Sequence, residues 1–162
     1  MKTRVFFLRV TEKRHEDGAL MKTENAAKML FLKNKPELLE IFGFLDCWFD
    51  ESNRVYHSTY APTKDLTHSN GTIVQGGFVA GMLDSTMAQY ILFTHQFTLN
   101  PLTLKMDVSY ILSCRPGLLE VQSKVLKMGK SIAFTTAEMY QDGNLLATAS
   151  ATNKLIQFDN NQ

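Results

Sequence analysis

Residues 74–87 read VQGGFVAGMLDSTM, and this stretch decides the fold. Two glycines open an apolar run that continues to about Phe93, with Asp84 as its one charged residue. The run is too long for a typical strand and has almost no charged face, so we predict a helix covered on most sides by other elements. A carboxylate inside such a helix is costly unless it is hydrogen-bonded, paired or used in chemistry.

Upstream of this helix, the apolar spacing first suits short helices and then approaches a period of two, which is typical of strands. Pro36 stands at a favourable first-turn position for a helix that Gly43 ends. The predicted elements are helices over 23–32 and 36–42, strands over 44–49 and 54–61, and a turn-like stretch over 62–70.

Downstream, we expect the central helix to end before Asn100-Pro101, because the residue before a proline disfavours helical geometry. Strands are predicted over 102–112, 118–127, 131–140 and 145–157. Their connections look like hairpins, and the last contains the Asp142-Gly143 pair favoured in tight reversals. Successive hairpins predict an antiparallel meander with the buried helix on one face. The predicted class is therefore α+β with the hotdog fold, a sheet wrapped around one long helix over about residues 76–94.

Length and composition restrict the class of protein. The 162 residues suit a single domain over 21–162, with residues 1–20 as a loosely attached extension. A formal charge of +1 without a basic block predicts no nucleic-acid partner. Cys47 and Cys114 have no metal-ligand or CxxC spacing, which favours a reduced, cytoplasmic protein without a metal. We also expect no membrane association, because no charge-free apolar run is long enough to span a bilayer.

Several motifs carry a resemblance to a known family. Gln75-Gly76-Gly77, followed after five residues by Leu83-Asp84, resembles the [His/Gln]-Gly-Gly-x5-[Leu/Val]-Asp signature of hotdog acyl-CoA thioesterases of the phenylacetate-degradation type. The same resemblance extends to TLKMDVSY over 103–110, to Pro116-Gly117, and to GKSIAF over 129–134. It covers roughly residues 40–157.

The resemblance implies roles for individual residues. Asp84 matches the carboxylate that attacks the thioester or activates water, Gly76 the backbone N–H that polarises the carbonyl, and Thr103 a hydroxyl that assists the water. The family usually has an Asn six residues before the His/Gln, where this chain has Ser69 followed by Asn70. The expected substrate-binding residues are Gln75, Gly77, Asn70, Ser69, Ser85, Arg115 and Lys130. The expected substrate is an acyl-CoA, and no cofactor is implied.

The spacing within the helix predicts an oligomer. Eight residues separate Gly76 from Asp84, which is about 12 Å of helical rise. A carbonyl that reacts needs its attacking group and its oxyanion donor within about 3 Å. We therefore expect a homodimer, or a homotetramer built from it, in which two helices meet across a two-fold axis and each supplies half of each site. A nearby donor should offset the burial of the Asp84 carboxylate, and the candidates are Ser85, Thr86, Gln89 and Thr103.

Alternatives remain for both residues and function. Asp84 can be a structural hydrogen-bonding residue, the glycine pair can serve close packing, and Thr103 can be an ordinary strand residue. Arg115 and Lys130 can be solvated charges rather than ligands of coenzyme A phosphates. A non-catalytic acyl-thioester-binding or regulatory hotdog module is the alternative function. A 3-hydroxyacyl-thioester dehydratase ranks lower, because its chemistry uses a His base and no His stands at the start of the helix.

Overall fold

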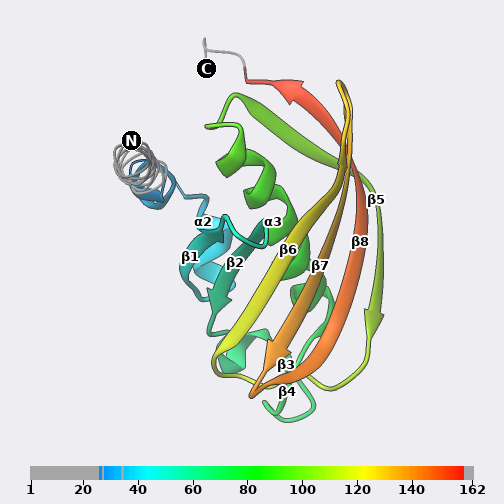
Figure 1. Cartoon of the computed structure of the whole chain (residues 1–162). Coiled ribbons are helices and arrows are strands. Elements are labelled where there is room, and N and C mark those ends of the chain that lie inside the picture. Colours follow the sequence, from blue (N-terminus) through cyan, green and yellow to red (C-terminus); the bar gives the residue numbers. More distant parts are fainter. Residues whose placement is uncertain (1–25, 27, 34, 159–162) are drawn as a thin grey trace, which may run out of the picture. The chain divides into compact units, whose positions relative to one another are not determined.

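Helix α3 spans Gly76–Thr94 and packs along one face of a six-stranded sheet (Figure 1). The computed structural model describes residues 26, 28–33 and 35–158. The predicted bounds of the central helix are confirmed. Nine side chains of α3 are buried, since this helix carries a broad apolar surface and a single charge. No helix among the described residues is long and apolar enough to cross a bilayer.

All neighbouring strands of the sheet are antiparallel, and their order is β1-β2-β6-β7-β8-β5. The strands are β1 (Phe44–Asp50), β2 (Val55–Tyr60), β6 (Leu119–Met128), β7 (Ile132–Gln141), β8 (Asn144–Gln157) and β5 (Leu99–Tyr110). The sheet curves along α3, as the sequence predicts for the hotdog fold (Figure 1). The fold prediction is confirmed.

The chain divides into two compact units, Met1–Asn34 and Lys35–Gln162. In the first unit, residues 26 and 28–33 are helical, in agreement with the predicted helix over 23–32, whereas the predicted extension over 1–20 lies outside the described residues. The second unit begins with helix α2 (Glu37–Ile41), for which Pro36 is the N-cap residue. The stretch predicted as turn-like contains a 3-10 helix, η1 (Lys64–Leu66), and strand β3 (Thr67–His68).

The meander prediction is wrong at the connection after β5. This strand pairs with β8 along its whole length, and β6 pairs with β2 on its other side. Eight residues separate β5 from β6, so Arg115-Pro116-Gly117 lies in a crossover and not in a hairpin. Proline and glycine signal a change of direction but not the pairing partner. The two later hairpins are confirmed, and the last has the two-residue loop Asp142-Gly143 with positive φ at both positions.

Pro101 does not end the central helix, which stops at Thr94, but lies inside β5 opposite Leu155. The Leu155 N–H donates to the Ser131 carbonyl on the other side of β8. The Leu155–Pro101 pair is therefore of the non-hydrogen-bonded type, and the Pro101 nitrogen faces the open edge of the sheet. An edge strand tolerates a proline at such a position because no ladder bond is lost.

Two tyrosines of β2 lie in the core beneath α3. Tyr56 and Tyr60 are fully buried, and Tyr60 shares a hydrogen bond of 2.9 Å with the hydroxyl of Thr86 on the helix. Burial raises the pKa of Tyr60 to about 12 and that of Tyr56 well above its usual value. Desolvation is the main cause at both residues, because it penalises the charged phenolate.

These tyrosines predict a loss of stability in alkali. Between about pH 10 and pH 12 an unfolded chain releases its tyrosine protons while folded Tyr60 keeps its own, so unfolding is favoured as the pH rises. We expect the Tyr60 contribution alone to lower the free energy of unfolding by about 2 kcal/mol across this interval. Urea unfolding of wild type and Tyr60→Phe from pH 9 to pH 12 measures it. Parallel pH curves for the two proteins would contradict the assignment.

Candidate active site

Asp84 lies in the middle of α3 and is half-buried against β5. The Thr103 hydroxyl donates to its Oδ1 at 2.7 Å. Of the four predicted donors, only Thr103 makes this bond: Thr86 bonds to the Met82 carbonyl, and Gln89 to Ser58. Within the described part of the chain, the Oδ2 atom of Asp84 has no hydrogen-bond partner. The carboxylate is therefore held through one oxygen, and the other is open to a reactant.

A β-bulge directs Thr103 towards the helix. The pairing of β5 with β8 shifts between Thr103 and Lys105, so that Leu104 is the extra residue. Thr103 and Asn153 are direct cross-strand partners and share the inner face. After the bulge the even-numbered residues of β5 face inward. Met106 and Val108 are therefore half-buried, whereas Lys105 and Asp107 are exposed. Bulges commonly re-aim a side chain beside an active site.

The N-terminus of α3 presents one open amide. The Gln75 side chain caps the helix, because its Oε1 accepts from the Gly77 N–H at 2.7 Å. The next two amides, of Phe78 and Val79, donate to the Gln75 carbonyl. The Gly76 N–H is thus the amide of this turn without a partner among residues 35–158. A Cβ at Gly77 would lie 2.7 Å from the capping Oε1, which explains the glycine there.

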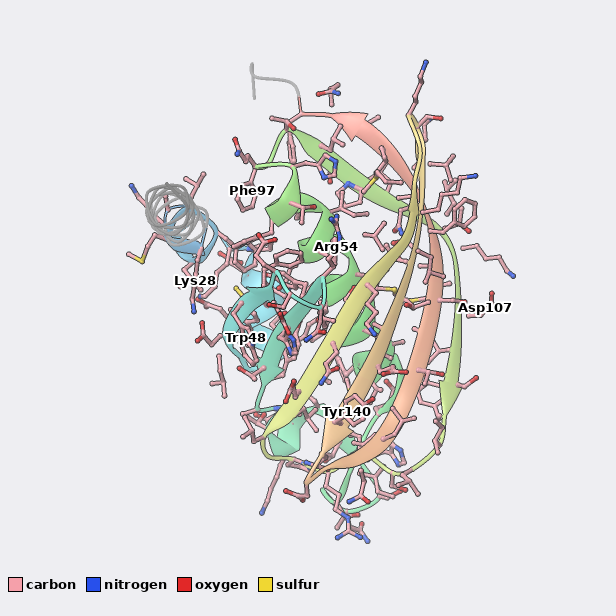
Figure 2. The ribbon with its side chains drawn as sticks, in the orientation of Figure 1. Lys28, Trp48, Arg54, Phe97, Asp107 and Tyr140 are labelled. Atoms are coloured by element: carbon pink, nitrogen blue, oxygen red, sulfur yellow. The ribbon has the colours of Figure 1, made fainter. Side chains whose placement is uncertain are left out.

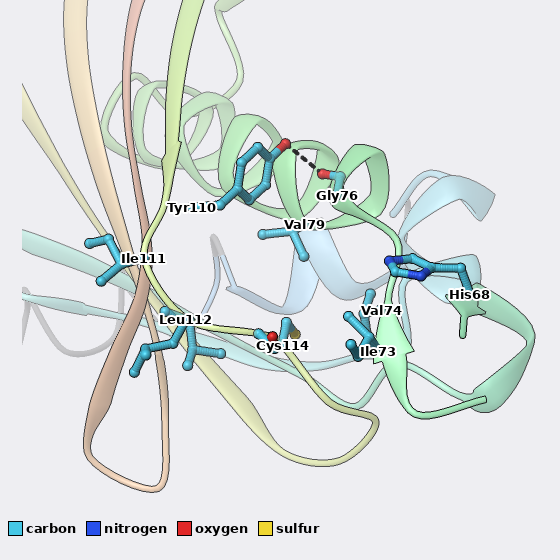
Figure 3. Close-up of a pocket in the computed structure, with 11 residues that line it drawn as sticks. His68, Ile73, Val74, Gly76, Val79, Tyr110, Ile111, Leu112 and Cys114 are labelled. Carbon is cyan, nitrogen blue, oxygen red and sulfur yellow. Dashed lines mark hydrogen bonds between the residues drawn. The ribbon is translucent and has the colours of Figure 1, made fainter. Parts of the chain in front are cut away.

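A cavity of about 390 Å³ adjoins this first turn (Figure 3). Its walls are mostly apolar and include Val79, Leu112 and Leu146, together with the rings of His68 and Tyr110. The Tyr110 hydroxyl reaches from the end of β5 and donates to the Gly76 carbonyl at 2.8 Å (Figure 3). An apolar space beside an open helical amide suits a neutral acyl group whose carbonyl needs a hydrogen-bond donor.

The structure separates the two halves of the predicted site. Gly76 and Asp84 belong to one continuous helix and are about 12 Å apart along its axis at 1.5 Å per residue. Thr103 is beside Asp84, whereas the cavity and Tyr110 are beside Gly76. Within one protomer, a single thioester carbonyl therefore cannot reach both groups at bonding distance.

The remaining predicted ligands lie at the periphery. Ser69 and Asn70 occupy the exposed turn between β3 and β4 (Ile73–Val74), both with positive φ. Ser85 is half-buried next to Asp84, without a side-chain bond among the described residues. Arg115 precedes β6 and Lys130 follows it, so this ten-residue strand places the two exposed cations at opposite ends of the sheet, about 33 Å apart. Their roles stay predictions.

Residues 65–154 match the family described as acyl-CoA thioesterase N-terminal domain. This match includes the helix, its capping residue, the bulge, strands β5, β6 and β7, and most of β8. The chain belongs to the acyl-CoA thioesterase N-terminal domain family. It is accordingly a thioester hydrolase, and the resemblance stated from the motifs is confirmed.

Solved structures of other proteins share the fold of this family member. A phenylacetic acid degradation-related protein of Ralstonia eutropha is 27% identical, with a TM-score of 0.67 over 74% of this chain and 89% of that one. The PaaI protein of E. coli, from the phenylacetic acid degradation operon, is 15% identical (TM-score 0.69; 82% and 95% covered). Zebrafish thioesterase superfamily member 2 is 20% identical (TM-score 0.65; 82% and 98% covered). No curated protein matches the sequence significantly.

Three residues near the thioesterase site did not emerge from the sequence as site residues: Tyr110, Asn153 and Thr135. The alternation of β8 offered a signal, because Asn153 stands at an inward position in line with Ala149, Ala151 and Leu155. A polar side chain in such a row needs a partner. The Thr103-x-x-Met106-x-Val108 motif also signalled the bulge. The step of three residues from Thr103 to Met106 departs from the period of two that a regular strand keeps.

Proposed function

We propose that this thioesterase hydrolyses acyl-CoA thioesters to a free carboxylic acid and coenzyme A, with Asp84 as the catalytic carboxylate. The observation that carries the proposal is the geometry of Asp84. This carboxylate sits on a largely buried helix, is held by the Thr103 hydroxyl through one oxygen, and leaves the other oxygen open. A half-buried charge that is oriented but not neutralised by a cation is typical of a group used in chemistry.

Apart from the protein's own residues, the proposed reaction uses only water and the substrate. With Asp84 as general base, its carboxylate takes a proton from water, the oxygen of that water attacks the thioester carbon, and the C–S bond breaks. The proton then passes to the departing thiolate. With Asp84 as nucleophile, its oxygen forms a mixed anhydride as the thiolate leaves, and water cleaves that anhydride. In both routes the Gly76 N–H stabilises the oxyanion.

We propose that the two halves of the site come from two protomers. Strand β5 is an edge of the sheet, so one side of its backbone has no strand partner among the described residues. Its neighbourhood exposes apolar side chains at Leu102, Leu104 and Ile111, and Figure 2 shows Asp107 pointing from β5 away from the sheet. Pairing with the β5 strand of a second copy would cover this edge, and a two-fold axis would place the Gly76 end of one protomer near Asp84 of the other.

The same axis supports a common role for Arg115 and Lys130. Two β5 strands related by a two-fold axis run antiparallel, so the Arg115 end of one sheet lies beside the Lys130 end of its partner. Both cations would then be available to the phosphates of one coenzyme A.

Gln75 fits a contact with the substrate, because its Nε2 has no partner among the described residues while its Oε1 caps the helix. Gly77, Ser69, Asn70 and Ser85 complete the proposed binding residues. The cytoplasm stays the predicted location, and neither Cys47 nor Cys114 forms a disulfide.

Release of free thiol from a panel of acyl-CoA thioesters tests this function. We expect the full chain to release coenzyme A from at least one short-chain, medium-chain or arylacetyl thioester, in proportion to enzyme concentration. The enzyme's own thiols should add little background, because both cysteines are buried and burial raises the pKa of Cys114 to about 11. Tight binding of these thioesters without release would instead support the non-catalytic binding module.

A further inference from the structure

Two polar residues are buried on the inner face of the sheet behind Thr103. Asn153 of β8 and Thr135 of β7 are each 1% exposed. The Nδ2 of Asn153 lies 2.9 Å from the Thr135 hydroxyl, and its Oδ1 lies 3.2 Å from the Thr103 hydroxyl. Thr135 also contacts the sulfur of Met87 on α3. A continuous polar chain therefore runs from the Asp84 carboxylate through Thr103 and Asn153 to Thr135, inside an otherwise apolar layer.

Proton counting favours one arrangement of this chain of hydrogen bonds. Thr103 has a single hydroxyl proton, and the ionised, closer Asp84 takes it at 2.7 Å. If the amide oxygen of Asn153 points at Thr103, it then faces the Thr103 oxygen at 3.2 Å with no proton between the two acceptors. Rotation of the amide by 180° exchanges its oxygen and nitrogen without moving the chain. The single Thr135 proton then goes to the Asn153 oxygen instead of the weakly accepting sulfur of Met87, Asn153 donates to the Thr103 oxygen, and Thr103 donates to Asp84.

We propose that Asn153 is a positioning residue for hydrolysis, whose amide N–H holds the Thr103 hydroxyl in the rotamer that donates to Asp84 Oδ1. The proposal rests on the function proposed above for Asp84. Without this amide, Thr103 sits exposed on an edge strand, where its hydroxyl can turn towards solvent. Asp84 would then lose the bond that directs its open oxygen at the reactant. Burial of Asn153 and Thr135 anchors the arrangement, because a deeply buried amide keeps its bonds.

A double-mutant cycle separates this role from a purely structural one. Asn153→Leu and Thr103→Val should each lower kcat about tenfold with little change in KM, and the double variant should be no slower than Thr103→Val alone. Non-additivity is expected because Asn153 acts only through the Thr103 hydroxyl. Multiplicative losses, or an Asn153→Leu enzyme with wild-type kcat, would overturn the proposal. Circular dichroism at the assay temperature verifies that each variant is folded.

Asn153→Asp adds a readout that packing alone would not change. A protonated carboxyl group has the same pattern as the rotated amide, with one oxygen accepting from Thr135 and an O–H donating to Thr103. The ionised group has acceptors only and competes with Asp84 for the Thr103 proton. The kcat of N153D relative to wild type should therefore fall as the pH rises, whereas this ratio for N153L should not vary with pH. A ratio for N153D that is flat, or that rises with pH, would overturn the positioning role.

The outcomes also separate this proposal from the function on which it rests. A wild-type enzyme that releases no thiol from any acyl-CoA would remove the proposed function itself. An active wild type together with an additive cycle and a flat N153D ratio would remove only the role of Asn153, leaving Asp84 and Thr103 as the catalytic pair.

Discussion

Asp84→Asn is expected to lower kcat by about 100- to 10,000-fold, the range typical for loss of a general acid–base group. The amide has nearly the same shape and can still accept from the Thr103 hydroxyl through its oxygen, so the fold should persist. What is lost is the negative charge on the open side of the group, which attacks the thioester or takes the proton of water. Steady-state release of coenzyme A from the best substrate of the panel measures the change.

The matched control is Asp142→Asn in the β7–β8 hairpin. Asp142 is exposed and has φ 52°, a conformation that Asn tolerates at least as well. This variant makes the same chemical change far from α3 and should keep both kcat and stability. If Asp84→Asn retained more than about half of wild-type turnover, as the control should, Asp84 would be a structural hydrogen-bonding residue and not the catalytic carboxylate.

A mixture of two inactive variants is expected to recover activity. Asp84→Asn lacks the carboxylate, and Gly76→Val places a side chain where the substrate carbonyl must approach the open amide. In a heterodimer of the two, one composite site carries both defects and the other carries none. Each mixed dimer keeps one intact site of two, so the doubly purified heterodimer should show about half of wild-type activity, whereas an unfractionated random mixture would show about one quarter. Co-expression with two affinity tags, followed by thiol release from the doubly purified protein, measures it.

The control is a dimer in which both differently tagged subunits carry the same variant. Such dimers should show no recovery of activity. Gly76→Val should fold, because the residue has no positive φ and the atoms nearest to a Cβ there belong to the exposed side chain of Tyr110, at 3.3 Å. A melting curve for the single variant checks this point. If both variants are inactive alone and the mixed dimers are also inactive, each site lies within one chain. An oxyanion donor other than the Gly76 N–H must then lie near Asp84.

Local pattern was sufficient for most of the individual elements. The apolar run with one carboxylate predicted α3 over about residues 76–94, and the Asp142-Gly143 pair predicted the β7–β8 hairpin, because both depend on side chains close in sequence. Local pattern did not predict the pairing between strands that are distant in sequence. The sequence pattern favoured a hairpin after β5, yet β8 supplies the partner, and Pro101 became acceptable only because β5 is an edge.

The sequence by itself predicted the hotdog fold and the family, and its resemblance to that family singled out Gly76, Asp84 and Thr103 as candidate site residues. Only the tertiary structure decided which donor holds Asp84, and that Asn153 and Thr135 stand behind that donor. Those contacts join β5, β7 and β8 across a sheet, where strand order and a bulge set which side chains meet. Neither strand order nor bulge position is a local property of the chain.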